Sequence, residues 1–380
     1  MKAFTIDVPD PVLDDLRARL ARTRFPDQLE GTAWEYGTEL GYLRDLCTYW
    51  REGFDWRSQE SRLNRIPQFR SQVGDLGLHF LHARSPEADA LPLLISHGWP
   101  GTVFEFIKIV GPLSDPVSHG GDARDAFHVI CPSLPGYGFS DAPRRPGFDV
   151  RGIAETFAAL MDDLGYTRYG VQGGDWGAFV STWLADFSPE KVCGLHLNMV
   201  VAGPPPGLED PNEGLSMGEL AALADMAKFA AQETGYQQIQ GTKPQTLGYA
   251  LNDSPAGLAA WLVEKLRSWT DCNGDVDAYL GRDEILTQIM LYWVTGSITS
   301  SMRLYCENNR SRRYAPAERI EVPTAGAIFP RELMRPPRRW AEARYNIVRW
   351  TEMPRGGHFA AMEQPELLVE DIRAFFRELR

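Results

Sequence analysis

The chain has 380 residues, of which 43% are hydrophobic and 24% are charged, a composition typical of a globular protein with a sizeable core. Its formal net charge of −12 provides no basic surface for phosphate groups, so nucleic acid is not an expected partner. A membrane is not an expected partner either, because no apolar run approaches the ~18 residues of a spanning helix and acidic residues interrupt the start of the chain.

The N-terminal part of the chain is predicted to be a helical extension that packs on a larger domain. Asp10 is expected to cap a helix whose first residue is Pro11, and leucines recur behind it at helical spacing. The aromatic-rich stretch from Trp34 to Phe69 is predicted to continue helically and to bury one face. We therefore assign residues 1–72 to an extension.

After this extension, short apolar strands alternate with helical stretches. Such alternation is typical of a mainly parallel sheet with helices on both faces, so it predicts an α/β fold. We assign residues 73–202 and 314–380 to this core. The predicted strands are Leu76–Ala83, Leu91–Ser96, Phe127–Cys131, Tyr169–Gln172, Gly194–Asn198, Thr324–Phe329 and Ile347–Trp350.

A helical insertion is predicted to interrupt the core. The alternation stops at a glycine- and proline-rich breaker, Gly203–Gly207, and strand character returns only after about Arg313. We assign residues 203–313 to a helical cap. Its many large aromatic side chains favour a ligand with a bulky hydrophobic part. These aromatic residues include Trp261, Trp269, Tyr292 and Trp293.

The segment Gly173-Gly174-Asp175-Trp176-Gly177 lies directly after a predicted strand and directly before a helical run. It matches the nucleophile elbow G-x-S-x-G, in which flanking glycines permit a strained turn that exposes the central side chain. Here the central residue is an aspartate, and a carboxylate at a helix N-terminus stays ionised and needs no base to become a nucleophile. The alternative interpretation is an ordinary turn with an aspartate N-cap.

A second motif, His97–Gly101, follows the second predicted core strand and leads into a possible capping box formed by Thr102 and Glu105. An α/β-hydrolase supplies half of its oxyanion hole from this loop. The backbone N–H groups of Trp99 and Trp176 are therefore predicted to face a developing oxyanion. The histidine of the motif is interpreted as stabilising the turn rather than as catalytic.

The third motif, Arg355–Phe359, places His358 in a glycine-containing loop near the C-terminus. This is where the base stands in the chain order nucleophile, acid, base, and the order of the three motifs argues against an incidental histidine. The acid that orients it is expected after the sixth predicted core strand, where Glu332 lies. Asn198, after an earlier strand, is not a carboxylate, and Glu342 is a weaker candidate because it falls on the following helix.

These motifs resemble those of the microsomal-type epoxide hydrolases, which have the α/β-hydrolase fold. The likeness spans nearly the whole chain, from Trp34–Gly37 through Phe54–Arg57 to Arg355–Ala361. The resemblance implies that the N-terminal extension wraps the catalytic domain and that the helical cap covers the elbow. Microsomal members carry an N-terminal membrane anchor, whereas this chain starts at the extension and looks like the bacterial or soluble branch, whose members serve detoxification or natural-product biosynthesis.

The resemblance also assigns roles to individual residues. It maps the nucleophile onto Asp175, the acid onto Glu332 and the base onto His358. It further picks out Tyr236 and Tyr305, whose hydroxyls would bind and protonate the epoxide oxygen. From the pattern alone, each tyrosine lies in a helical stretch where core packing is the ordinary role.

The implied reaction converts a hydrophobic epoxide into a vicinal diol. The elbow carboxylate attacks a ring carbon from behind while the tyrosines act on the oxygen, and water activated by the histidine then hydrolyses the enzyme ester. A haloalkane dehalogenase is the main alternative, since it also uses an elbow aspartate and a histidine, but it does not need Tyr236 and Tyr305. A catalytically silent ligand-binding protein is the other alternative, although such a protein should have lost part of this machinery.

The sequence predicts no cofactor and no metal, because it contains no zinc-like ligand cluster, no P-loop and no dinucleotide fingerprint. Its five cysteines are scattered without a pairing pattern, which predicts reduced thiols and a cytoplasmic location. The expected partner is a small hydrophobic epoxide. The sequence is compatible with a homodimer but contains no specific signal for one.

Overall fold

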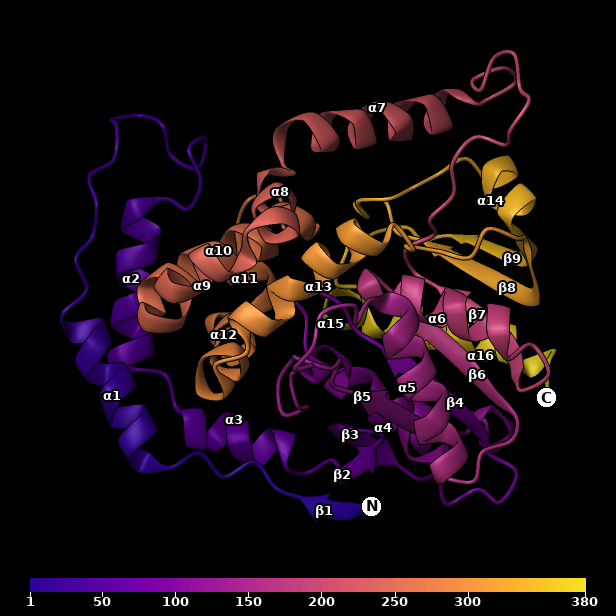
Figure 1. Cartoon of the computed structure of the whole chain (residues 1–380), viewed down its shortest axis with the longest axis horizontal. Coiled ribbons are helices and arrows are strands. Elements are labelled where there is room, and N and C mark those ends of the chain that lie inside the picture. The colour runs from indigo at the N-terminus through magenta and orange to yellow at the C-terminus, as the bar shows by residue number, and fades with distance from the viewer.

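A nine-stranded sheet lies at the centre of the computed structural model, which describes residues 1–380 (Figure 1). The first four strands along the sheet pair antiparallel, and all the following neighbours pair parallel. This mainly parallel sheet confirms the predicted α/β fold. In their order across the sheet, the strands are β1 (Lys2–Phe4), β2 (Gln68–Val73), β3 (Leu76–Ala83), β5 (Phe127–Pro132), β4 (Leu91–Ser96), β6 (Tyr169–Gly173), β7 (Val192–Leu197), β8 (Ile320–Ile328) and β9 (Tyr345–Glu352).

Helices cover both faces of this sheet. Successive residues of a strand point to opposite faces, so Leu93 and Ile95 of β4 join the core beneath α4 (Ile107–Ser114) and α16 (Pro365–Arg377). Leu94, between them, belongs to the other core, which α5 (Val150–Asp163) and α6 (Trp176–Phe187) cover. The remaining core helices are α14 (Arg338–Arg344), α15 (Ala360–Glu363), η1 (Val103–Phe106), η2 (Val117–His119) and η3 (Ala123–Asp125).

The N-terminal extension contributes β1 and most of β2 to the sheet, so the prediction that the chain is helical as far as Phe69 was wrong at the end of that stretch. Strand β1 pairs with β2, and β2 pairs with β3 across a tight turn at Gly74, whose φ of 55° favours glycine. The predicted first helix exists, but it begins at Asp10 after an N-cap at Pro9. The extension's helices are α1 (Asp10–Ala21), α2 (Leu40–Glu52) and α3 (Trp56–Leu63).

The helical cap lies between β7 and β8 in the chain. Figure 1 shows α1 and α2 beside the cap helices, and both helices contact α10. The division of the chain at residues 72, 202 and 313 remains our proposal. The cap helices are α7 (Met217–Gln232), α8 (Gly235–Thr242), α9 (Pro244–Asp253), α10 (Pro255–Trp269), α11 (Val276–Leu280), α12 (Arg282–Thr295) and α13 (Ile298–Ser311).

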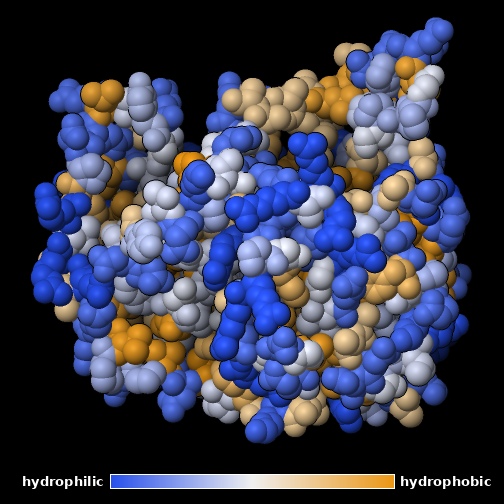
Figure 2. Space-filling model, in the orientation of Figure 1, coloured by the Kyte–Doolittle hydropathy of each residue, from blue (hydrophilic) through white to orange (hydrophobic).

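Helix α7 differs from the other long cap helices because none of its residues is buried. Figure 2 shows hydrophobic side chains along this helix above an otherwise mostly hydrophilic face. It is tied to the core by an ion pair between Asp225 and Arg335, 2.6 Å long. No helix of the structure combines the length and the apolar character that crossing a membrane requires.

Candidate active site

Asp175 occupies a strained turn between β6 and α6. Its φ of 49° and ψ of −129° are unusual for a residue other than glycine. The neighbouring glycines are needed because the backbones approach so closely: a side chain at Gly177 would clash with the Ser96 carbonyl, and one at Gly98 would clash with the Asp175 carboxylate. The turn therefore has the geometry of a nucleophile elbow and holds the carboxylate at the end of the sheet.

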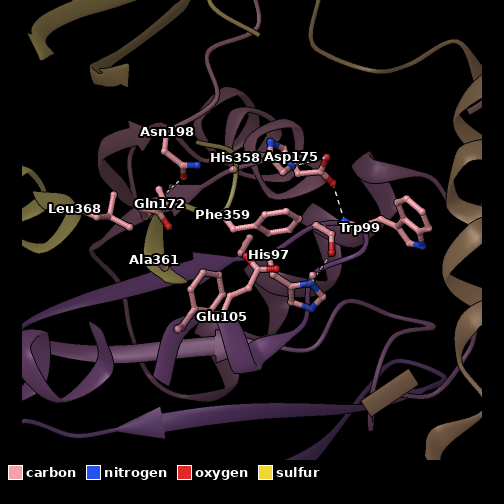
Figure 3. Close-up of a pocket in the computed structure, with 16 residues that line it drawn as sticks. His97, Trp99, Glu105, Gln172, Asp175, Asn198, His358, Phe359, Ala361 and Leu368 are labelled. Atoms are coloured by element: carbon pink, nitrogen blue, oxygen red, sulfur yellow. Dashed lines mark hydrogen bonds and ion pairs between the residues drawn. The ribbon is translucent and has the colours of Figure 1, made fainter. Parts of the chain in front are cut away.

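The two backbone amides predicted to form an oxyanion hole lie next to this carboxylate. The Trp99 N–H donates a hydrogen bond of 2.7 Å to Asp175 Oδ1 (Figure 3). Trp176 is the first residue of α6, so its amide lies at the helix N-terminus directly after the carboxylate. Both amides are thus placed where they could hold negative charge on an oxygen attached to the Asp175 side chain.

His358 and Glu332 come from two different loops and meet beside Asp175. His358 Nδ1 lies 2.7 Å from Glu332 Oε1, and His358 Nε2 lies 3.4 Å from Asp175 Oδ2. The side chains of His358 and Glu332 are nearly completely buried, with 2% and 1% exposed. The two other positions do not pair with His358: Asn198 lines the same small cavity but its amide oxygen accepts a hydrogen bond from Gln172, and Glu342 pairs with Arg338 at the surface.

The charges around His358 control its protonation. Burial by itself lowers the pKa of His358, but the charges and hydrogen bonds of Glu332 and Asp175 more than reverse this, so its net pKa lies well above the ordinary value. With Asp175 ionised, the ring is therefore protonated at neutral pH. Loss of the Asp175 charge would remove part of the stabilisation of this proton.

Glu363, which no sequence pattern singled out, holds the histidine loop in place. Its carboxylate accepts backbone N–H groups of Gly357, Phe359 and Asp271, each at 2.9 Å. Burial raises the pKa of Glu363 to about 7 although these three donors lower it. A glutamate at the end of α15 carries no sequence signal of such a role, because its partners are backbone groups of a loop and of the cap.

Replacing Glu363 by glutamine should destabilise the protein by about 1–3 kcal/mol, because an amide NH₂ group would face backbone donors that the carboxylate now accepts. Turnover should fall as well, since the loop positions His358. Denaturant unfolding at unchanged m-value measures the first effect. Glu366→Gln, an exposed change on α16, is the matched control, and equal stability of the two variants would refute this role.

Tyr236 and Tyr305 lie side by side above the elbow. Their rings are edge to face at 5.9 Å, with Tyr236 stacked on Trp99 at 5.2 Å and Tyr305 edge-on to Trp176 at 4.7 Å. Burial and then the charge of Asp175 raise the pKa of Tyr236, and burial, Tyr236 and Asp175 raise the pKa of Tyr305. Both phenols therefore keep their protons at neutral pH and can donate hydrogen bonds.

One cavity of about 210 Å³ brings Asp175, Tyr236 and Tyr305 together. The rest of its wall is mainly apolar, which suits a hydrophobic ligand. The four cap aromatics emphasised in the sequence analysis are not part of this wall: Tyr292, for example, donates a hydrogen bond to the Gly101 carbonyl, and Trp269 packs edge-on against His358. The apolar lining residues are instead Trp176, Phe179, Met199, Phe229, Tyr314, Leu333 and Met334.

His97 serves the turn, as the sequence indicates. Its Nε2 accepts the backbone N–H of Leu134 at 3.1 Å, and its Nδ1 lies 3.0 Å from the carbonyl oxygen of Gly98. Burial lowers the pKa of His97 to about 4, so the ring is neutral. It thereby links the loop after β4 to the loop after β5.

The sheet, the elbow and the histidine loop together define an α/β hydrolase, and comparison with protein families agrees. A model described as "alpha/beta hydrolase fold" matches residues 92–239, and one described as "Epoxide hydrolase N terminus" matches residues 1–106. A putative epoxide hydrolase from Stigmatella aurantiaca is 48% identical over 378 residues, covering 99% of this chain and 85% of the relative. Epoxide hydrolase 1 of Sus scrofa is 40% identical, with 99% and 88% covered.

Solved structures give the same result. The crystal structure of juvenile hormone epoxide hydrolase from Bombyx mori aligns with a TM-score of 0.92 at 33% identity, covering 100% of this chain and 94% of that one. The epoxide hydrolase of Aspergillus niger aligns with a TM-score of 0.90 at 33% identity, covering 100% and 96%. The chain belongs to the epoxide hydrolase family, which confirms the resemblance found in the sequence.

Proposed function

We propose that this enzyme converts a hydrophobic epoxide into a vicinal diol through an alkyl ester of Asp175. The observation that carries the proposal is the cavity that the Asp175 carboxylate shares with the protonated phenols of Tyr236 and Tyr305. Opening an epoxide requires attack on carbon from one side and a proton donor at the oxygen. Asp175 meets the first requirement, and Tyr236 and Tyr305 meet the second.

Formation of the ester prepares His358 for the second step. While Asp175 is ionised, its charge helps to keep the pKa of His358 high. Esterification removes that charge, so the pKa of His358 falls and the ring releases its proton to solvent, from which it is recovered when Asp175 is regenerated. The neutral ring can then act as a base. It then takes a proton from a water molecule that attacks the ester carbonyl, while Glu332 stabilises the charged ring.

The oxyanion formed in this step would be held by the amides of Trp99 and Trp176. The Trp99 N–H already donates to Asp175 Oδ1 at 2.7 Å, so it is aligned before the reaction begins. Such preorganised donors lower the barrier because they need no reorientation as charge develops. Collapse of the intermediate releases the diol and regenerates Asp175.

A single-turnover reaction with racemic styrene oxide in heavy-oxygen water tests the proposal. The ester route puts heavy oxygen into the Asp175 carboxylate and leaves the first diol largely unlabelled, as mass analysis of the diol and of the Asp175 peptide would show. A labelled diol with unlabelled Asp175 would mean that water attacks the epoxide directly. A chloroalkane in place of the epoxide tests the dehalogenase alternative, for which we expect no halide release.

Removing one hydroxyl, by Tyr236→Phe or Tyr305→Phe, should slow formation of the ester by about 10-fold, and removing both should slow it by about 10²–10⁴-fold. The physical reason is that the epoxide oxygen then leaves as an unprotonated alkoxide. Stopped-flow or rapid-quench measurement of ester formation checks this. Tyr249→Phe, at a tyrosine 72% exposed on α9, is the control, and a double variant with unchanged ester formation would exclude this role.

A further inference from the structure

A second, smaller cavity borders Asp175. It shares only Asp175 with the cavity of the two tyrosines and extends to His358 and the histidine loop (Figure 3). It offers about 20 Å³ to the centre of a water molecule, which is room for about one water. A space of this size beside the carboxylate and the base admits water but not an organic substrate.

Glu105 lines this small cavity and has no role in the mechanism described so far. No other side chain hydrogen-bonds to its carboxylate, and Figure 3 shows it among the cavity residues with Phe359 and His97. The predicted capping box forms only in part: a hydrogen bond from the Thr102 backbone lowers the pKa of Glu105, but the Thr102 hydroxyl accepts from the Phe104 N–H instead of the Glu105 N–H, and the Glu105 side chain also lines the cavity. Any side chain at Gly101 would collide with this carboxylate, so the glycine of the motif leaves the space that Glu105 fills.

Further residues of the cavity wall have buried polar atoms that lack partners within the protein. The Ser96 hydroxyl oxygen and Gln172 Oε1 are buried and make no hydrogen bond. Much of the remaining wall is apolar, including Phe106, Phe359 and Leu368. Buried polar atoms without partners are costly, and a bound water is their usual partner.

The charge state of Glu105 is coupled to that of Asp175. Burial raises the pKa of Glu105 to about 8; the charge on His358 lowers it, and the charge on Asp175 raises it. The carboxyl is therefore largely protonated in the resting enzyme at neutral pH. When Asp175 becomes an ester, loss of its charge lowers the pKa of Glu105, whereas loss of the proton from His358 raises it, so Glu105 stays largely protonated and offers its carbonyl oxygen to the water as a hydrogen-bond acceptor.

We infer that this small cavity binds the water molecule that hydrolyses the enzyme ester, and that Glu105 holds this water between the Asp175 carbonyl carbon and His358. The inference rests on the proposed ester mechanism and adds a water-binding residue to it. Glu105 is the only carboxylate of the cavity wall besides Asp175 itself. After Asp175 has been esterified, it is thus the remaining carboxyl group of the wall that can accept a hydrogen bond from the water.

The water oxygen bonds to the Asp175 carbonyl carbon, one of its protons passes to His358 Nε2, and the other remains on the new hydroxyl group, hydrogen-bonded to Glu105. Collapse of the intermediate breaks the bond to the alkyl oxygen, which takes the proton from His358 and leaves as the diol. Ionisation of the Asp175 carboxyl then releases the second proton, which replaces the one that a tyrosine gave to the epoxide.

Rapid-quench kinetics of Glu105→Gln with styrene oxide tests this inference, because it measures formation and decay of the Asp175 ester separately. We expect formation within about threefold of the wild-type rate and decay slowed at least about 10-fold, so that the ester accumulates. The pH profile of the decay should lose one titrating group. Glu105→Asp, which keeps the carboxylate but shortens it, should restore part of the decay rate and provides the same test if the glutamine variant does not fold.

Decay at the wild-type rate in Glu105→Gln, or formation and decay slowed equally, would overturn the water-binding role. A wild-type enzyme that forms no ester would overturn the proposed function instead, and the two failures are therefore distinguishable. Glu60→Gln is the matched control, since Glu60 is a buried carboxylate that accepts the Val8 backbone N–H far from the site. It should leave the ratio of the two rates unchanged.

Discussion

Asp175→Asn should reduce turnover of styrene oxide by at least about 10³-fold, because the amide that replaces the carboxylate is a poor nucleophile at carbon. Asparagine has nearly the same size and also tolerates a positive φ, which is 49° at this position. The fold should therefore be retained, and the loss should fall on ester formation. Steady-state diol production by chromatography, together with circular dichroism, measures both properties.

The Asp175→Asn experiment needs one check of the variant and one control variant. Mass analysis of the peptide that contains position 175 verifies that the amide has not hydrolysed back to aspartate. Asp163→Asn, an exposed change on α5, serves as the control for loss of one carboxylate and should keep full activity. Turnover above one tenth of the wild-type rate with an intact amide would show that another group or water attacks the epoxide.

His358→Gln should stop the reaction after its first step. Asp175 can still attack the epoxide, but without a base at His358 the water remains weakly nucleophilic, so ester decay should slow by about 10²–10⁴-fold. One equivalent of epoxide should be consumed, and the intact protein should gain the mass of one substrate. Intact-protein mass spectrometry over time records both the gain and its persistence.

The control for this variant is His119→Gln, which changes an exposed histidine in η2 and should behave as the wild type. The outcome also tests the charge coupling between His358 and Asp175, whose closest atoms lie 3.4 Å apart. If no mass is gained, the protonated ring is needed for the first step as well. Rapid release of diol without any accumulated ester would contradict the assignment of His358 as the base.

Local pattern was sufficient to predict most of the sheet. The core strands β3 and β4 have the predicted bounds, because a buried strand is a short apolar run with turn residues at its ends. Strand β2 was missed since its alternating residues, Gln68–Val73, are only partly buried and depend on pairing with β3. Pairing between strands is a contact between segments, and hydrophobic periodicity does not encode it.

The residues of the candidate site also differ in how far the local sequence predicts them. Asp175 and His358 could be predicted because each lies in a glycine-rich turn whose backbone geometry requires particular residues in sequence. Glu332 could be predicted only from the order of the strands. Tyr236 and Tyr305 could be predicted only from the resemblance, since a tyrosine in a helix usually packs in the core. Nothing in the local sequence distinguishes tyrosines that line the cavity from those that do not.

The sequence by itself determined the α/β class, the elbow and the order of its partners, because these depend on short-range backbone chemistry. Only the tertiary structure placed Glu363 beneath the histidine loop and Glu105 in the small cavity beside Asp175. It also showed that Phe179, Met199 and other residues, rather than the expected cap aromatics, form the wall of the larger cavity. Which side chains share a cavity depends on how segments distant in sequence pack together, and no local pattern records that packing.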